Sequence, residues 1–473
     1  MQADLKIIKI LFSLFGILLL QGTEARASQP VRIFGNILND ETREISLSFR
    51  EHPLAEMETI KAKLDRQGNF QLKLNIEKAR PCYLRYGREQ SVVYLFPGDR
   101  IDLIADAESF DETLVFTGYG SGVNASQFLA AFFLKFEDKL FRREANNRIK
   151  EASPASYLEY LSRQKEYKLN FLDENKDLPE DFVDYMAKRI EYMWGRDLLE
   201  YPVKHAYLNE LPYERVPVGT SYYGFLNELN IQDKEAWELR EYQDFLDAFF
   251  AYEYSKVISK MSPSSRFAYL YDRAPDYLTG MPLSVFRARS LMHAIQYLNP
   301  GDVLPRYFQF VNSEEGLALK EYLEYAFKDI LALAPGNPAP DFSLEDREGK
   351  MVSLSDYQGK TIYLHFWASW CDPCKNELSY INKLAFEFSD EDIVILNVSL
   401  DEFQKTWLQK VEETQLAGIH VWAKGLWSEV PMSYGIRTLP GYMIISKDGT
   451  IANASAFAPS NPEASAQILR NLR

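Results

Sequence analysis

Cysteine is scarce in this chain of 473 residues, which contains only Cys82, Cys371 and Cys374. Three thiols form at most one internal disulfide, which excludes the densely cross-linked folds of small secreted domains. Histidine is also rare, with five residues, and no His-x3-5-His pair accompanies the two C-terminal cysteines. Because a zinc site usually needs four such ligands, the sequence indicates no metal centre.

The chain has no excess of positive charge. It contains 53 Lys and Arg against 68 Asp and Glu, which gives a net charge of −15 at pH 7. Nucleic acids and anionic membrane surfaces are bound by basic faces, and no run of Lys or Arg offers one. We therefore expect no nucleic-acid partner.

One long apolar run is present, at the N-terminus. Lys6 and Lys9 precede an apolar stretch over residues 10–20, and Ala25-Arg26-Ala27 follows. A basic start, a short apolar run and a small-x-small site are typical of a secretory signal peptide. The stretch is shorter than the roughly 20 residues of a membrane-spanning helix, which argues against an uncleaved anchor. We predict a signal peptide over residues 1–27, cleavage near Ala27, and an extracytoplasmic, periplasmic location.

The rest of the chain predicts a multidomain fold with three patterns. Six short alternating segments separated by turn signals predict an antiparallel, sandwich-like β domain over residues 28–117. They are VRIFGNIL, EISLSFR, NFQLKLNI, PCYLRYG, SVVYLF and RIDLIAD. Apolar residues at intervals of three and four predict an all-α domain over residues 118–335. A Pro- and Gly-rich boundary, LAPGNPAPDF at residues 333–342, then precedes alternating strand and helix patterns. These predict an α/β domain over residues 336–473.

The sequence HFWASWCDPC, residues 365–374, places two cysteines between a predicted strand and a predicted helix. We considered a zinc half-site, a structural disulfide and a redox pair. A disulfide closing so short a loop stabilises a fold only weakly. The unpaired N–H groups and dipole of a helix start favour a thiolate, and proline is tolerated in a first turn, where Pro373 would lie. These features favour Cys371 as an exposed attacking thiolate and Cys374 as the resolving thiol.

No cofactor other than a redox-active Cys371–Cys374 disulfide is expected. Cys82 lies in the strand-like stretch RPCYLRYG. We interpret it as a small buried apolar residue rather than a third redox group.

Residues from about 336 to 473 resemble the thioredoxin fold in its TlpA/ResA-like extracytoplasmic branch. The resemblance is carried by the stretches PAPDFSLEDREGKMVSLSDYQGK, FWASWCDPC with Glu377 following, and TLPGYMIISKDGTI. The chain as a whole resembles multidomain versions from Bacteroidota, in which a β domain and a helical domain come first. FPGDRIDL and VFTGYGSGVN carry a looser likeness to that leading domain.

The resemblance implies roles for further residues. Pro440 matches the cis-proline that faces the cysteines in this fold, and Leu439 matches the residue whose backbone bonds to an extended substrate. Trp370 matches the aromatic residue that flanks the nucleophile. The resemblance also implies a protein disulfide as substrate and a membrane thiol carrier as electron donor.

Two positions depart from the family pattern. His365 stands where thioredoxins carry a buried carboxylate and TlpA-like proteins often carry Asn. It is either a base near the resolving thiol or a neutral histidine hydrogen-bonded in the core, and the sequence does not decide between them. Asp372 places a negative charge beside Cys371, which should raise the pKa of that thiol and favour a reducing couple.

Two functions of different classes follow. The first is an extracytoplasmic thiol-disulfide oxidoreductase that reduces protein disulfides. The second is a binding or scaffold protein in which the thioredoxin-like part is non-catalytic or secondary. Peroxidase chemistry is disfavoured because Ala368 stands where peroxiredoxins carry the threonine of their Thr-x-x-Cys motif.

Overall fold

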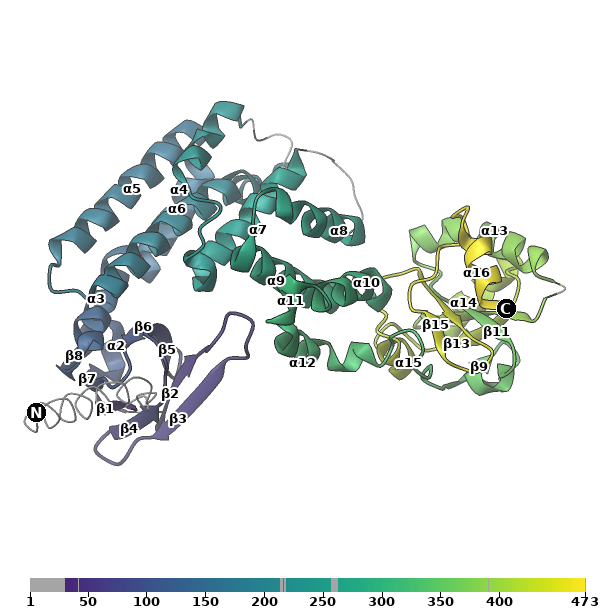
Figure 1. Ribbon diagram of the computed structural model, residues 1–473, viewed down its shortest axis with the longest axis horizontal. Coiled ribbons are helices and arrows are strands. Elements are labelled where there is room, and N and C mark those ends of the chain that lie inside the picture. The colour runs from purple at the N-terminus through teal and green to yellow at the C-terminus, as the bar shows by residue number, and fades with distance from the viewer. Residues whose placement is uncertain are drawn as a thin grey trace, which may run out of the picture. The chain divides into compact units, whose positions relative to one another are not determined.

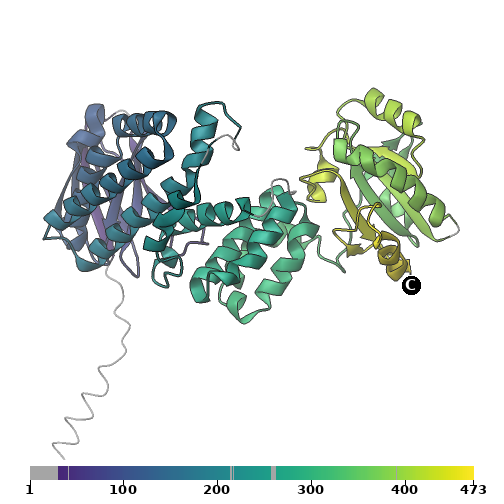
Figure 2. The ribbon, with the colours of Figure 1, turned by 90° about the horizontal axis from the view of Figure 1, so that it is seen from above.

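A computed structural model of the chain describes residues 30–472, except residues 41, 213–215, 217, 257–262 and 390. The predicted signal peptide lies outside the described residues. Figures 1 and 2 show the chain coloured by residue number. Its described residues fall into two compact units, one that ends at residue 229 and one that begins at residue 230. Among the described helices, none combines the length and the apolar character needed to cross a bilayer. The domain boundaries at 117/118 and 335/336 remain predictions.

The first unit begins with two four-stranded sheets, in the orders β4-β1-β7-β8 and β3-β2-β5-β6. Their strands are β1 (Val31–Leu38), β2 (Glu44–Phe49), β3 (Glu58–Lys63), β4 (Asn69–Leu74), β5 (Arg80–Tyr86), β6 (Glu89–Leu95), β7 (Arg100–Asp106) and β8 (Val115–Tyr119). Side chains from both sheets share one apolar core, which includes Ile33, Leu47 and Leu84. All the pairings are antiparallel except that of β1 with β7, which is parallel.

The antiparallel β domain is therefore confirmed, with one parallel pair that the sequence did not predict. Six strands match the alternating segments, whereas β3 and β8 were missed. β3 has the sequence ETIKAK and no fully buried side chain, and β8 buries only Phe116. Both are edge strands, so neither needs the buried alternation by which a strand is recognised in a sequence.

Helices follow in both units, which confirms the helical middle region. In the first unit, α2 (Phe110–Thr113) lies between β7 and β8, and α3 (Ser121–Phe136), α4 (Lys139–Glu151), α5 (Pro154–Glu174) and α6 (Glu180–Leu208) follow β8. In the second unit they are α7 (Arg240–Ser255), α8 (Pro263–Arg273), α9 (Gly280–Tyr297), α10 (Pro300–Val311), α11 (Glu314–Leu317) and α12 (Lys320–Leu331). The aromatic residues Phe128, Phe132 and Phe182 lie in an apolar core of the first unit, as expected for aromatic stripes at helical spacing.

The second unit ends in a seven-stranded sheet of order β10-β9-β13-β12-β11-β14-β15. Its strands are β9 (Ser343–Asp346), β10 (Met351–Ser353), β11 (Thr361–Trp367), β12 (Ile393–Ser399), β13 (Ile419–Trp422), β14 (Gly441–Ile445) and β15 (Ile451–Asn453). Its helices are α13 (Asp372–Glu387), α14 (Gln404–Thr414), α15 (Glu429–Ser433) and α16 (Ala464–Leu472). Every residue of β11 is buried, because the strand is central and both of its faces are covered.

The Pro- and Gly-rich boundary is attached to this sheet. The Gly336 N–H donates to the Ile451 carbonyl at 2.8 Å, and the Ala339 N–H donates to the Gly449 carbonyl at 3.0 Å. Pro338 and Thr450 form a β-bridge between these two bonds. The boundary segment therefore pairs with the edge of the sheet instead of crossing solvent.

Candidate redox site

The two cysteines lie where β11 gives way to α13. Cys371 is the N-cap residue of α13, and its Sγ accepts a hydrogen bond from the Cys374 N–H at 3.1 Å. The two Sγ atoms are bonded to each other. Pro373 lies in the first turn of the helix, where its missing N–H leaves no acceptor unpaired. This places the Cys371 sulfur against the positive end of a 16-residue helix.

The exposure of Cys371 differs from the prediction. Cys371 was expected to be exposed, but it is only 5% exposed in the disulfide-bonded state, while Cys374 is fully buried. Both belong to the apolar cluster that also contains Trp367 and Leu378. Cys371 is thus the more accessible of the two, as the assigned order of attack requires, and the apolar surroundings limit its contact with solvent.

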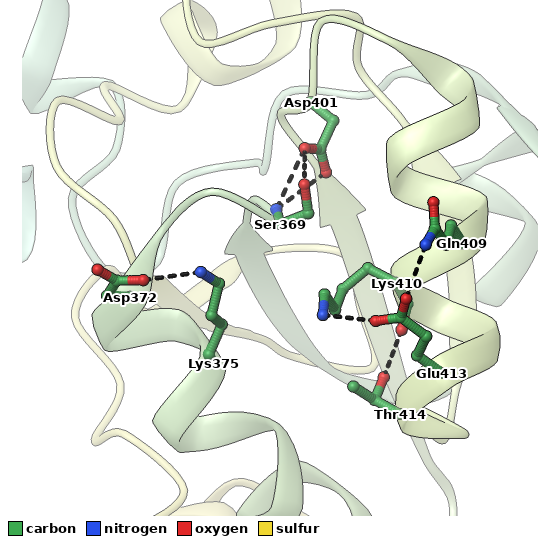
Figure 3. Close-up of polar contacts among 8 residues, drawn as sticks. All are labelled: Ser369, Asp372, Lys375, Asp401, Gln409, Lys410, Glu413 and Thr414. Carbon is green, nitrogen blue, oxygen red and sulfur yellow. Dashed lines mark hydrogen bonds and ion pairs between the residues drawn. The ribbon is translucent and has the colours of Figure 1, made fainter.

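Asp372 does not act on Cys371 as an isolated negative charge. Lys375 Nζ lies 2.7 Å from Asp372 Oδ1, one turn along α13 (Figure 3). Lys375 lowers the pKa of the Asp372 carboxyl through this bond and through its charge. The lysine also offsets part of the repulsion between Asp372 and a Cys371 thiolate, which weakens the expected effect of Asp372 alone.

A buried carboxylate, which the sequence analysis missed, holds the turn in front of Cys371. Asp401 accepts bonds from the Ser369 N–H at 3.1 and 3.2 Å and from the Ser369 hydroxyl at 2.5 Å (Figure 3). The Ser399 hydroxyl donates to its Oδ2 at 2.8 Å. Asp401 follows β12, which runs parallel to β11, so both strands end at the same edge of the sheet. That placement is the signal that could have revealed it.

The sheet register brings residues 437–440, the proline segment, close to the cysteines. β14 pairs with β11 in the antiparallel direction, with Gly441 opposite Phe366, so the segment before Gly441 meets the turn after β11. The Leu439–Pro440 bond is cis, as the resemblance implied. Leu439 packs against the apolar cluster that contains both cysteines. Trp370, beside Cys371, is 57% exposed.

His365 lies in the core of the sheet. It is fully buried, its Nδ1 lies 2.9 Å from Asn397 Oδ1, and its ring stacks on that of Tyr442. The Asn397 amide nitrogen donates to two backbone carbonyls, so its oxygen faces the histidine and Nδ1 carries the proton. Burial lowers the pKa of His365 to about 4. These contacts favour the second interpretation, a neutral histidine that is hydrogen-bonded in the core. A ring with so low a pKa is only a weak base.

Glu377 connects α13 to the loop before α16. Its carboxylate accepts the Ser460 N–H at 3.0 Å and the Ser460 hydroxyl at 2.6 Å. The Tyr363 hydroxyl donates to the Phe457 carbonyl of the same loop at 2.6 Å. These bonds fix a second loop beside the helix that carries the cysteines.

The third cysteine takes no part in this site. Cys82 is fully buried in β5 of the other unit, and burial raises the pKa of its thiol to about 12. Its interpretation as a buried apolar residue is confirmed. In the described part of the chain, no group of three or more His, Cys, Asp or Glu residues is arranged to hold a metal ion.

Comparison with known proteins places this site among thiol-disulfide oxidoreductases. The model of the AhpC/TSA family matches residues 335–454. The thiol-disulfide oxidoreductase ResA of Geobacillus thermodenitrificans is 35% identical over 137 residues, 28% of this chain and 78% of that protein. ResA of Bacillus thuringiensis is 34% identical over 116 residues, 24% of this chain and 66% of that protein. A solved thiol-disulfide oxidoreductase structure from Bacteroides fragilis is 30% identical, with 29% of this chain and all of that chain covered and a TM-score of 0.26.

Proposed function

The chain belongs to the TlpA/ResA-like thiol-disulfide oxidoreductases of the thioredoxin family, and from this premise we propose that it reduces disulfide bonds in proteins outside the cytoplasm. The observation that carries the proposal is the cysteine pair at the start of α13, with Cys371 Sγ against the Cys374 N–H. A thiolate at that sulfur would accept the same N–H, which lowers the free energy of the ionised form.

The reaction proceeds in two exchange steps. The Cys371 thiolate attacks one sulfur of the substrate disulfide, which forms a mixed disulfide and expels the other substrate sulfur as a thiolate. Cys374 then loses its proton and attacks Cys371 Sγ, which releases the second substrate sulfur and closes the Cys371–Cys374 bond. Two electrons pass from the cysteine pair to the substrate. A membrane thiol carrier, implied by the family resemblance, returns the pair to the dithiol.

Substrate binding is assigned to the residues around the proline segment. The Leu439 backbone would hydrogen-bond an extended stretch of substrate beside the mixed disulfide. No backbone hydrogen bond in the described part of the chain uses the N–H or the C=O of Leu439. Trp370 offers an exposed aromatic surface next to Cys371. These features support a protein or peptide disulfide as substrate over a small disulfide.

The location follows from the first 27 residues. Their signal-peptide pattern supports export and cleavage near Ala27, and an exported redox pair would meet disulfide-bonded proteins. Mass spectrometry of the mature protein would test this part, with Ser28 expected as the new N-terminus.

Turnover of insulin disulfides by the full chain, with dithiothreitol as reductant, tests the activity. Cys371→Ser should abolish the rate above background, and Cys374→Ser should accumulate a mixed disulfide with insulin. Cys82→Ala is the matched control and should keep the wild-type rate. A wild-type rate in the double variant Cys371→Ser, Cys374→Ser would contradict the proposal and leave the scaffold function as the better account.

A further inference from the structure

A side chain from the helical part of the second unit is hydrogen-bonded to the proline segment. Asn299 lies between α9 and α10. Its Oδ1 accepts the Arg437 N–H at 2.8 Å and the Thr438 N–H at 3.0 Å. Its Nδ2 donates to the Thr438 carbonyl at 3.1 Å. A side-chain amide carries both a donor and an acceptor, so Asn299 pairs with this backbone as a neighbouring strand would.

We propose that Asn299 is a positioning residue of the redox site, which fixes the backbone in front of Leu439 so that an extended disulfide substrate can bind there. The inference rests on the proposed function, because the docking role of Leu439 belongs to that proposal. It assigns to the helical segment a part in substrate recognition that neither the cysteine motif nor the family resemblance indicates.

Asn299 is not used for the task that its position would suggest. It is the N-cap residue of α10, where an asparagine side chain commonly accepts an N–H of the first turn. Here the side chain makes no capping bond. Both its oxygen and its nitrogen are directed to residues 437–438 instead. The Asn299 side chain therefore bonds to the proline segment instead of to the first turn of α10.

The surrounding packing keeps this contact close. A Cβ atom on Gly301, in the first turn of α10, would lie 1.8 Å from Ser455 Cβ. Gly435 has a positive φ of 61°, and a Cβ atom on it would lie 2.7 Å from Pro300 Cγ. Because backbone meets backbone or a proline ring at both points, the start of α10 cannot move nearer to these loops, and a larger residue at either glycine would push it away.

The consequence concerns the residue that follows. The Thr438 C=O and the Leu439 N–H share one peptide plane. With the Thr438 N–H and C=O both held by Asn299, the direction of the Leu439 N–H is therefore fixed before a substrate arrives. Preorganisation of this kind lowers the entropy lost on binding. Loss of the Asn299 bonds should therefore lower the rate constant for substrates that bind to the Leu439 backbone. The reactivity of the Cys371 thiol itself should not change.

The test compares a protein disulfide with a small one. Reduced full-length wild type, Asn299→Ala and Asn299→Asp are mixed with insulin or with hydroxyethyl disulfide, and the second-order rate constants are measured. Asn299→Ala should lower the insulin rate constant about tenfold, as expected for the loss of hydrogen bonds worth roughly one factor of ten. The rate constant for hydroxyethyl disulfide should stay within about twofold, because this substrate has no backbone to dock.

A second variant and a control complete the experiment. Asn299→Asp keeps two acceptor bonds but cannot donate to Thr438, so its insulin rate constant should fall less. Asn312→Ala, at the other end of α10, removes a side-chain bond to Phe308 and should change neither rate. Equal falls for both substrates in the Asn299 variants, or no fall for insulin, would overturn the inference. A wild type that reduces neither disulfide would instead overturn the proposed function, and this inference with it.

Discussion

The Ser369 hydroxyl donates a hydrogen bond to Asp401 Oδ1 at 2.5 Å, which ties the turn before the cysteine pair to the end of β12. Asp401 is only 1% exposed, and its acceptors serve two serine hydroxyls and one backbone N–H. A buried carboxylate is retained only where such donors compensate its lost hydration. Asp401 therefore helps to hold the turn that carries Trp370 and leads to Cys371, together with the backbone bond from the Cys371 N–H to the Ala368 carbonyl.

Asp401→Ala should destabilise the protein and slow it. The substitution leaves buried donors without acceptors, which costs about 3 kcal/mol of unfolding free energy, measurable by urea denaturation. With the turn released, the Cys371 sulfur is less well oriented for attack. The rate of insulin reduction should therefore fall about tenfold. Asp448→Ala is the control, since Asp448 accepts the Thr450 N–H in an exposed turn. Equal stability of the Asp401 and Asp448 variants would contradict this account.

The Asp372–Lys375 pair should tune how readily Cys371 ionises. Asp372→Asn removes a negative charge and leaves Lys375 unopposed, so alkylation of reduced Cys371 by iodoacetamide at pH 7 should become roughly twofold to threefold faster. Lys375→Ala should slow alkylation by a similar factor. Both changes should shrink at high ionic strength, because the two side chains are exposed.

Another ion pair of this domain provides the control for that measurement. Lys410 and Glu413 pair on α14 at 2.6 Å (Figure 3). Lys410→Ala should leave the alkylation rate unchanged. Should Asp372→Asn slow alkylation, or Lys410→Ala change it as much, the local charges would not be what sets the reactivity of Cys371.

The local parts of the site could be predicted from the sequence. An apolar run ending at Trp367, a Cys-x-x-Cys pair and a proline in the first turn determine the strand, the turn and the helix start by short-range rules. The helix start is also the feature that would stabilise a Cys371 thiolate, on which the proposed function depends. The strand–turn–helix pattern and the position of Cys371 at the helix start are both set by residues close together in the sequence. Neither requires knowledge of the tertiary fold.

The parts that depend on distant segments could not be predicted. Asp401 bonds to Ser369, which lies far from it in the sequence. Asn299 lies in the predicted helical domain, whereas the residues 437–438 to which it bonds lie in the predicted α/β domain. A lone Asp after a strand or a lone Asn before a helix has many ordinary roles, such as capping. His365 could not be assigned either, because the sequence does not show that Asn397 and Tyr442 enclose its ring.

Glu377 should hold the loop around Ser460 in place. Glu377→Ala removes the acceptor of the Ser460 N–H, so hydrogen exchange at that amide should accelerate, with a loss of about 1 kcal/mol of stability. Glu387→Ala is the matched control on the same helix, because Glu387 accepts the Ser465 hydroxyl, outside the loop at Ser460. Unchanged exchange at Ser460 in the Glu377 variant would mean that the loop is held by other contacts, such as the Tyr363 bond to Phe457.

Acid should destabilise the protein through buried histidines, of which His365 is the more deeply buried. Burial lowers the pKa of His365 to about 4 in the folded state, against about 6.5 in an unfolded chain. Between these values the unfolded state binds more protons, so stability is fully present above pH 6.5 and falls as the pH drops toward 4. The loss at pH 4 should be about 3 kcal/mol larger in wild type than in His365→Asn. Urea titrations at pH 7 and pH 4 would measure it, with exposed His293→Asn as control, and parallel losses in wild type and His365→Asn would show that His365 is not the group responsible.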